Sequence, residues 1–263
     1  MYFQDNGSDE FWNSDGHGFV ANKKKDAFLN FVKDAGLVNY NKANGGDKYT
    51  KNEANGFAEV LFKCGSDSDV TWALMLCNLA YTPEFNWFVK KVPPHENVTP
   101  DRLKFMLEDV MENDTKGLGK RNISDAFKIL LTQTPFGEVI GLGKCDYTEK
   151  TSANGNETIK LNSFYRDKWE NPVPEVILYS LFKFAENCGD YYQFTLDRLL
   201  DHAVDSDGVS PTEIFNLDRD TMIKILNGLS INHPDFITAQ FNLDLDTITL
   251  NADKSSDDVL QLI

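Results

Sequence analysis

Apolar and polar positions in the last third of the chain follow a helical period in three segments. Residues 175–188 are almost continuously apolar and are followed by Gly189, a pattern typical of a buried helix that ends at a glycine. Residues 210–213 (sequence SPTE) place a capping serine, a proline and a reciprocal glutamate at the start of a short helix. Asp218 is positioned to cap a longer helix that runs to about Ser230.

Shorter segments between and after these helices have the two-residue period of strands. The segments are an extended stretch at 192–194 before a helix near 196–202, and a hairpin over 236–243 and 247–251. The order helix, strand, helix, helix, two-stranded wing is that of a winged helix-turn-helix, so we predict a winged-helix-like domain over residues 171–263. Its two consecutive helices are expected to bury Ile214, Phe215, Leu217, Ile223, Leu226 and Leu229.

The first half of the chain predicts mainly helices. A helix over 23–35, a wing-like segment over 37–49 and a helix opened by the capping-box pattern at 50–53 resemble half of a second winged helix. Further helices are expected from Ser68 to Trp87, from Thr99-Pro100 onward and over 123–131. We therefore predict a helical domain over 22–135 with a partial winged-helix-like start, preceded by a loop or linker over 1–21.

The pattern changes between these two regions. Residues 139–147 and 158–165 alternate as two strands joined through Asn154-Gly155, which predicts a β-hairpin connector over 136–170. The glycines of 141–144 (GLGK) are interpreted as part of the first strand, since the sequence lacks the third glycine of a dinucleotide-binding loop. The expected fold is thus α+β and predominantly helical, with winged-helix-like units at both ends and a helical middle that carries a β-hairpin.

Composition and charge narrow the class of protein. With 41% hydrophobic and 12% aromatic residues among 263, the chain is expected to fold around a packed core. No apolar run approaches the roughly 20 residues that span a bilayer, and the N-terminus lacks signal-peptide features, so we expect a cytoplasmic protein without a membrane partner.

The net charge is −15, and fourteen acids against four bases from Asp190 onward place −10 of it in the last third. Such a field disfavours nucleic acid.

The sequence contains no complete catalytic or metal-binding motif. The four cysteines and four histidines are isolated in the sequence, and no HExxH, GxSxG or P-loop pattern occurs. The calcium-loop-like segment 205–208 (DSDG) would need an acid where Ile214 stands. We therefore predict no catalytic residue, no metal site and no cofactor for this chain.

Two small groups of basic residues are candidate binding residues. Lys23, Lys24 and Lys25 begin a predicted helix, where they would either contact nucleic-acid phosphates or form a solvated helix start. Arg219 and Lys224 lie on the longer C-terminal helix, which begins with as many acids as bases. That helix is expected to bind a protein partner rather than DNA.

Several segments together resemble a known bacterial family of unknown function. They are 71–74 (TWAL), 86–88 (NWF), 134–139 (TPFGEV), 209–219 (VSPTEIFNLDR) and 234–237 (PDFI). Members of this family stand beside, or are fused to the C-terminus of, phosphoadenosine phosphosulfate (PAPS) reductase-like proteins in phage-defence and DNA sulfur-modification islands. The resemblance covers the chain from about Asn22 onward and implies a role in such a system, but it supplies no active site. The family's N-terminal helix is missing here, which implies a fragment of a fused parent or a shortened first domain.

Three functions follow from these observations. The leading hypothesis is a non-catalytic adaptor that docks a PAPS reductase-like protein or another defence-system component. The first alternative is a winged-helix DNA-binding protein that uses the basic run at 23–25. The second is an enzyme, either with an unrecognised carboxylate site or as the C-terminal part of a PAPS reductase-like enzyme whose catalytic half lies outside this chain.

Overall fold

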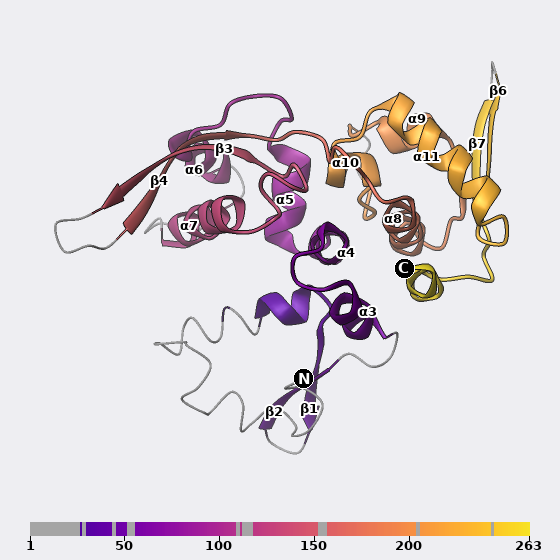
Figure 1. The fold of residues 1–263 in the computed structure, drawn as a ribbon, viewed down its shortest axis with the longest axis horizontal. Coiled ribbons are helices and arrows are strands. Elements are labelled where there is room, and N and C mark those ends of the chain that lie inside the picture. Colours follow the sequence, from indigo (N-terminus) through magenta and orange to yellow (C-terminus); the bar gives the residue numbers. More distant parts are fainter. Residues whose placement is uncertain are drawn as a thin grey trace.

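Helices are the main secondary structure of the described residues, and three small antiparallel sheets lie at the edges of the fold (Figure 1). The computed structural model describes residues 27, 30–43, 46–51, 56–108, 111, 118–151, 157–203, 206–242 and 245–263. Over these residues the prediction of a mostly helical α+β fold is confirmed. Buried apolar side chains between Ala35 and Leu260 form one continuous core cluster that crosses the predicted domain boundaries.

The N-terminal part contains a hairpin followed by a helix. Residues 30–34 are helical and lead through Gly36 into strands β1 (Val38–Ala43) and β2 (Gly46–Lys51), which pair antiparallel. The predicted capping box at 50–53 is wrong, because Thr50 pairs with Asn39 in this hairpin. Helix α3 (Phe57–Cys64) begins instead after Gly56, whose φ of 69° is readily adopted by glycine.

Four helices follow before the second hairpin: α4 (Asp69–Leu79), α5 (Pro83–Lys91), α6 (Pro100–Glu108) and α7 (Leu118–Gln133). The single helix predicted from Ser68 to Trp87 is therefore two helices, and Pro83 occupies the first turn of the second one. The predicted start of α6 is confirmed, since the Thr99 hydroxyl accepts a hydrogen bond from the Arg102 amide at 3.2 Å.

The second hairpin consists of β3 (Lys144–Thr151) and β4 (Glu157–Tyr165) and projects from the helices at the left of Figure 1. The first strand begins at Lys144, later than predicted, so residues 141–143 are an irregular segment that leads into it rather than part of the strand. Gly141 has a φ of 80°, and a Cβ atom there would lie 2.5 Å from the Lys168 carbonyl oxygen. Close approach of two backbones, and not strand pairing, therefore requires this glycine.

The C-terminal part contains the predicted succession of helices and strands. In order these are α8 (Pro174–Asn187), β5 (Gln193–Phe194), α9 (Leu196–Leu200), α10 (Pro211–Phe215), α11 (Arg219–Asn232), β6 (Ile237–Asn242) and β7 (Leu245–Leu250). The three strands form one antiparallel sheet in the order β5-β7-β6. Helix α12 (Ser256–Val259) and the 3₁₀ turn η1 (Leu260–Leu262) end the chain, and α12 packs against α8.

Local capping signals in this part are confirmed. The Ser210 side chain accepts from the Glu213 amide while the Glu213 carboxylate accepts from the Ser210 amide, which completes the capping box of α10. The Asp218 carboxylate accepts from the Thr221 amide at 2.8 Å and caps α11. Of the six side chains predicted to be buried, only Ile223 is half-buried, and the other five are 4% exposed or less.

A buried guanidinium joins the C-terminal part to the helical middle. Arg166 follows β4 and is 3% exposed. Its Nη1 donates to the carbonyl oxygens of Val89 (2.6 Å) and Val92 (2.9 Å) at the end of α5, and its Nη2 donates to the Glu213 carbonyl oxygen in α10 (2.6 Å). Carbonyls in the last turn of a helix lack intrahelical partners and carry partial negative charge, so one cation satisfies two helix ends. Burial lowers the pKa of Arg166 to about 10, against the opposing effect of the nearby Glu213 carboxylate.

The residues that follow Arg166 continue this connection. The Trp169 amide donates to the Phe215 carbonyl oxygen at 3.0 Å, and the two rings lie 5.0 Å apart. Lys168 pairs with the Asp218 carboxylate at 3.8 Å. The segment between β4 and α8 is thus fastened to the α10–α11 corner by backbone, ring and ion-pair contacts.

We expect Leu226→Ala to lower the free energy of unfolding by about 2–5 kcal/mol, because it empties a fully buried position on α11. Chemical denaturation with the same probe on both proteins measures the difference. Ile231→Ala on the same helix is the matched control, since Ile231 is 78% exposed. Equal effects of the two substitutions would contradict the burial of this face.

We expect Arg166→Met to cost about 3–5 kcal/mol, because the apolar side chain leaves three carbonyl oxygens without their charged donor. Arg102→Ala is the control, since Arg102 forms an exposed pair with Glu96 at 2.8 Å and its loss should cost about 0–1 kcal/mol. Denaturant unfolding of both variants decides whether the buried cation stabilises the junction.

Candidate functional site

The exposed face of α11 carries one residue of each chemical kind. Asp220, Lys224, Asn227 and Ile231 are exposed and recur at intervals of three and four residues, so they line one side of the helix. An acid, a base, an amide and an apolar side chain in one row give a mixed surface without excess positive charge. A helix that binds phosphates usually presents several bases, so this row suits a protein surface better.

Arg219 at the start of α11 is engaged by two carboxylates of its own chain. Its Nη1 lies 3.1 Å from Asp246 of β7, and its Nη2 contacts Asp197 of α9. The guanidinium therefore joins three elements, and its charge is compensated within the fold. Neighbouring Asp218 is paired with Lys168 and accepts from the Thr221 amide, and these hydrogen bonds lower its pKa.

The predicted binding residues thus differ in their placement. Lys224 is exposed and forms no ion pair with any residue that the structure describes, whereas Arg219 is held in two. The predicted phosphate-binding residues Lys23, Lys24 and Lys25 lie outside the described residues. Asp197 lies 22 residues from Arg219 and Asp246 lies 27 residues from it, so no local spacing predicts these pairs.

A second group of titratable side chains lies beside the buried arginine. The Asp167 carboxylate accepts from Lys144 at 2.5 Å and from the Tyr165 hydroxyl at 3.2 Å. Burial acts to raise the pKa of Asp167, but the hydrogen bonds from Lys144 and from the Lys168 amide hold it below its ordinary value. Sequence reasoning missed this group, because its members come from both sides of the hairpin.

His95 lies at the edge of this group. Its Nδ1 lies 4.0 Å from the Asp167 carboxylate, and its Nε2 lies 3.2 Å from the Asn216 amide nitrogen. His95 and Asn216 both have positive φ values, 59° and 51°. The contacts therefore fasten the loop before α6 to the α10–α11 corner.

The described residues contain neither a metal-binding cluster nor a membrane-spanning helix. Within the described ranges, no three His, Cys, Asp or Glu side chains gather in a way that would hold a metal ion. No helix among those same residues is both long and apolar enough to cross a membrane.

Comparisons with known proteins identify a fold but no family. No protein-family model matches the sequence, and no curated protein matches it either. The structure is similar to a magnesium ion-bound crystal structure of SspB, with a TM-score of 0.67 and 14% identity over 99% of this chain and 80% of that chain. A second SspB crystal structure is similar with a TM-score of 0.64 and 14% identity over 99% of this chain and 81% of that chain. At this identity the likeness shows a shared fold alone.

Proposed function

We propose that the chain is a non-catalytic adaptor whose winged-helix-like C-terminal unit docks a protein partner through α11. The succession from α8 to β7 and the sheet order β5-β7-β6 support the winged-helix interpretation. In that interpretation α11 occupies the position of the recognition helix, and β6 and β7 form the wing. The partner that the family resemblance suggests is a PAPS reductase-like protein or another component of a phage-defence or DNA-modification system.

The observation that carries this proposal is the internal neutralisation of Arg219. A recognition helix that binds DNA keeps its arginines available for phosphates and base edges. Here Arg219 is paired with Asp197 and Asp246, which leaves Lys224 as the exposed base on a helix that also exposes Asp220. The surrounding third of the chain adds a net −10, which further disfavours a nucleic-acid backbone. A mixed helix face with an exposed isoleucine at its end is suited to a protein interface.

We expect the tagged chain to copurify with a PAPS reductase-like protein of a phage-defence or DNA-modification system when the two are coexpressed. Lys224→Glu combined with Ile231→Asp should lower the recovered partner about tenfold or more, which corresponds to roughly 1.4 kcal/mol of binding free energy. Both positions are exposed, so the melting temperature should not change. Lys104→Glu on α6 is the matched control, because Lys104 is an exposed base far along the chain from α11. Normal recovery with the double variant, or none with the wild type, would exclude docking of this partner through α11.

DNA binding is tested separately through Lys23, Lys24 and Lys25. If these residues contact phosphates, duplex affinity should fall with rising salt, and replacing all three by alanine should flatten the logarithmic slope by about two to three units. The adaptor hypothesis expects weak or no duplex binding near physiological salt and a normally folded triple variant. Fluorescence anisotropy with a labelled duplex measures both. Sub-micromolar binding that the triple substitution abolishes would replace the adaptor hypothesis with the DNA-binding one.

A further inference from the structure

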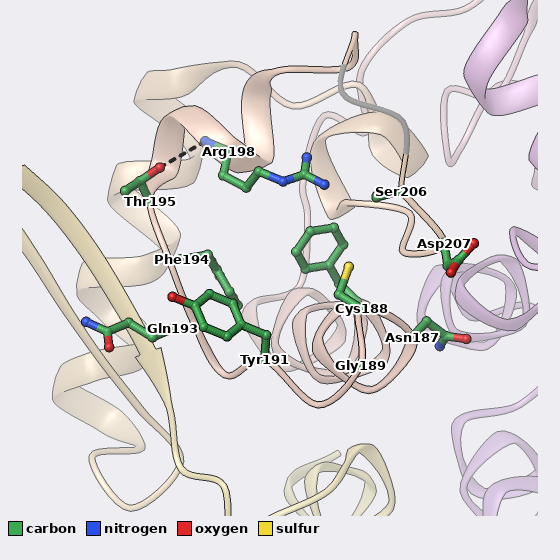
Figure 2. A pocket seen from close by; sticks show the side chains of 11 residues that line it. Asn187, Cys188, Gly189, Tyr191, Gln193, Phe194, Thr195, Arg198, Ser206 and Asp207 are labelled. Atoms are coloured by element: carbon green, nitrogen blue, oxygen red, sulfur yellow. Dashed lines mark hydrogen bonds between the residues drawn. The ribbon is translucent and has the colours of Figure 1, made fainter.

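A pocket of about 670 Å³ opens beside β5, the edge strand of the C-terminal sheet, and is separate from the exposed face of α11 (Figure 2). It is bounded by the end of α8, by β5, by the start of α9 and by the loop at 206–207. We call it the Arg198 pocket. Its size lies within the roughly 300–1,000 Å³ that is typical of ligand-binding pockets.

Arg198 is held in the pocket by a ring rather than by a carboxylate. Its guanidinium carbon lies 5.5 Å from the centre of the Phe184 ring, and Phe184 is 3% exposed. It forms no ion pair with any carboxylate of the described residues. A guanidinium that stacks on a ring keeps its N–H edge available, so it is oriented to receive a carboxylate in a two-point hydrogen bond. Figure 2 shows the guanidinium pointing into the space above Cys188.

Apolar and oppositely charged groups line the rest of the pocket. The Tyr191 side chain is 64% exposed, an unusual state for a large ring, and it stands across the pocket from the Arg198 guanidinium in Figure 2. Asp207 lies at the far side of the pocket from Gln193 in that view and is exposed. An occupant would therefore meet a cation, an exposed ring and an anion in separate places.

Strand β5 offers an unpaired backbone edge to the same pocket. It is the outer strand of the sheet and pairs only with β7 within the described residues. The Tyr192 carbonyl accepts from the Leu250 amide of β7 at 2.8 Å. Because backbone groups alternate along a strand, the N–H and C=O of Gln193 face away from β7. An exposed strand edge of this kind accepts an extended peptide by β-augmentation.

We propose that the Arg198 pocket binds an extended peptide segment of the protein partner, which adds to the edge of β5. The segment places an acidic side chain on Arg198 and, two positions away on the same side of the strand, an apolar ring or leucine against Tyr191. A basic residue further along meets Asp207. This inference rests on the proposed adaptor function. It adds a second contact with the partner, a peptide in the pocket, to the docking surface on α11.

Charge favours a peptide over a nucleotide here. The net −10 of the surrounding sequence repels a doubly charged phosphate, and Asp207 opposes Arg198 within the pocket. A peptide carries the opposite charges that both groups require, and its backbone satisfies the Gln193 edge. A mononucleotide offers neither the second charge nor the strand pairing.

The test begins with a random heptapeptide display library selected on the wild-type chain. Enriched sequences should carry Asp or Glu two positions from Phe, Tyr, Trp or Leu. A blocked synthetic peptide of the enriched sequence should then bind about tenfold or more weaker to Arg198→Gln and Arg198→Ala, because a charge-assisted hydrogen bond is lost. Tyr191→Ala should also weaken binding. Lys104→Ala is the matched control, since it removes an exposed base outside the pocket and should leave the affinity unchanged.

A double-mutant cycle identifies the contact itself. Replacing the acid of the peptide by its amide should cost the wild-type chain as much as Arg198→Gln does, and the two changes together should cost little more than either. Additive losses would show that the acid lies elsewhere and would overturn the proposal. So would an absence of enriched peptides, unchanged affinity of the Arg198 variants at unchanged melting temperature, or displacement of the peptide by adenosine monophosphate.

Copurification separates failure of this inference from failure of the adaptor function. If the partner copurifies with wild type and with Arg198→Gln equally, the pocket proposal is wrong and the adaptor proposal stands. If the peptide binds as described but no partner copurifies, the pocket is a peptide site and the assignment of the partner fails. Release of the copurified partner by the synthetic peptide would support both.

Discussion

The hydrogen bonds of the buried Arg166 guanidinium determine how the helical middle and the C-terminal part meet. A cation inside a protein costs free energy unless polar groups replace its water, and here three main-chain carbonyls do so. Two of them end α5 and one lies in α10, so the two helices must meet at one point for the charge to be tolerated. Within the described residues the Arg166 Nε has no acceptor, so the hydrogen bonds of Nη1 and Nη2 must compensate the buried charge. The continuous core then packs around a junction whose geometry is set by hydrogen bonds.

This junction also positions the surfaces that we assign to binding. Trp169 and Lys168 follow Arg166 and contact Phe215 and Asp218 at the corner from which α11 begins. The direction of α11 is therefore fixed relative to the helical middle and not only by its own sheet. An adaptor needs such rigidity, because a partner that contacts several elements binds more tightly when those elements are already in place.

Some of the acidic side chains in the last third also act through specific ion pairs. Arg219 pairs with Asp197 and Asp246, and Lys168 pairs with Asp218, so two bases offset part of the acid excess at the start of α11. Arg198, one helix away, stays outside such pairs among the described residues and rests on Phe184. Two arginines of the same unit thus differ in their contacts: Arg219 is paired with two carboxylates, whereas Arg198 stacks on a ring, as the proposed peptide site requires.

The local sequence determined those helices whose capping residues and apolar spacing lie within one or two helical turns. The caps at Ser210, Asp218 and Thr99 formed as expected, because a capping side chain reaches only the backbone of the next three residues. The buried face of α10 and α11 likewise follows from helical spacing, which repeats every three to four residues.

Tertiary structure decided everything that depends on residues far apart in the chain. Thr50 carries a helix-start pattern but lies in β2, because cross-strand pairing with Asn39 outweighs a weak local preference. The local pattern predicts Gly141 to be a strand residue, whereas in the structure the close approach of the Lys168 backbone requires a glycine there. The same holds for the role of Arg166, 77 residues from Val89, and for the partners of Arg219. Such contacts depend on the path of the chain between their members, and no spacing in the sequence records that path.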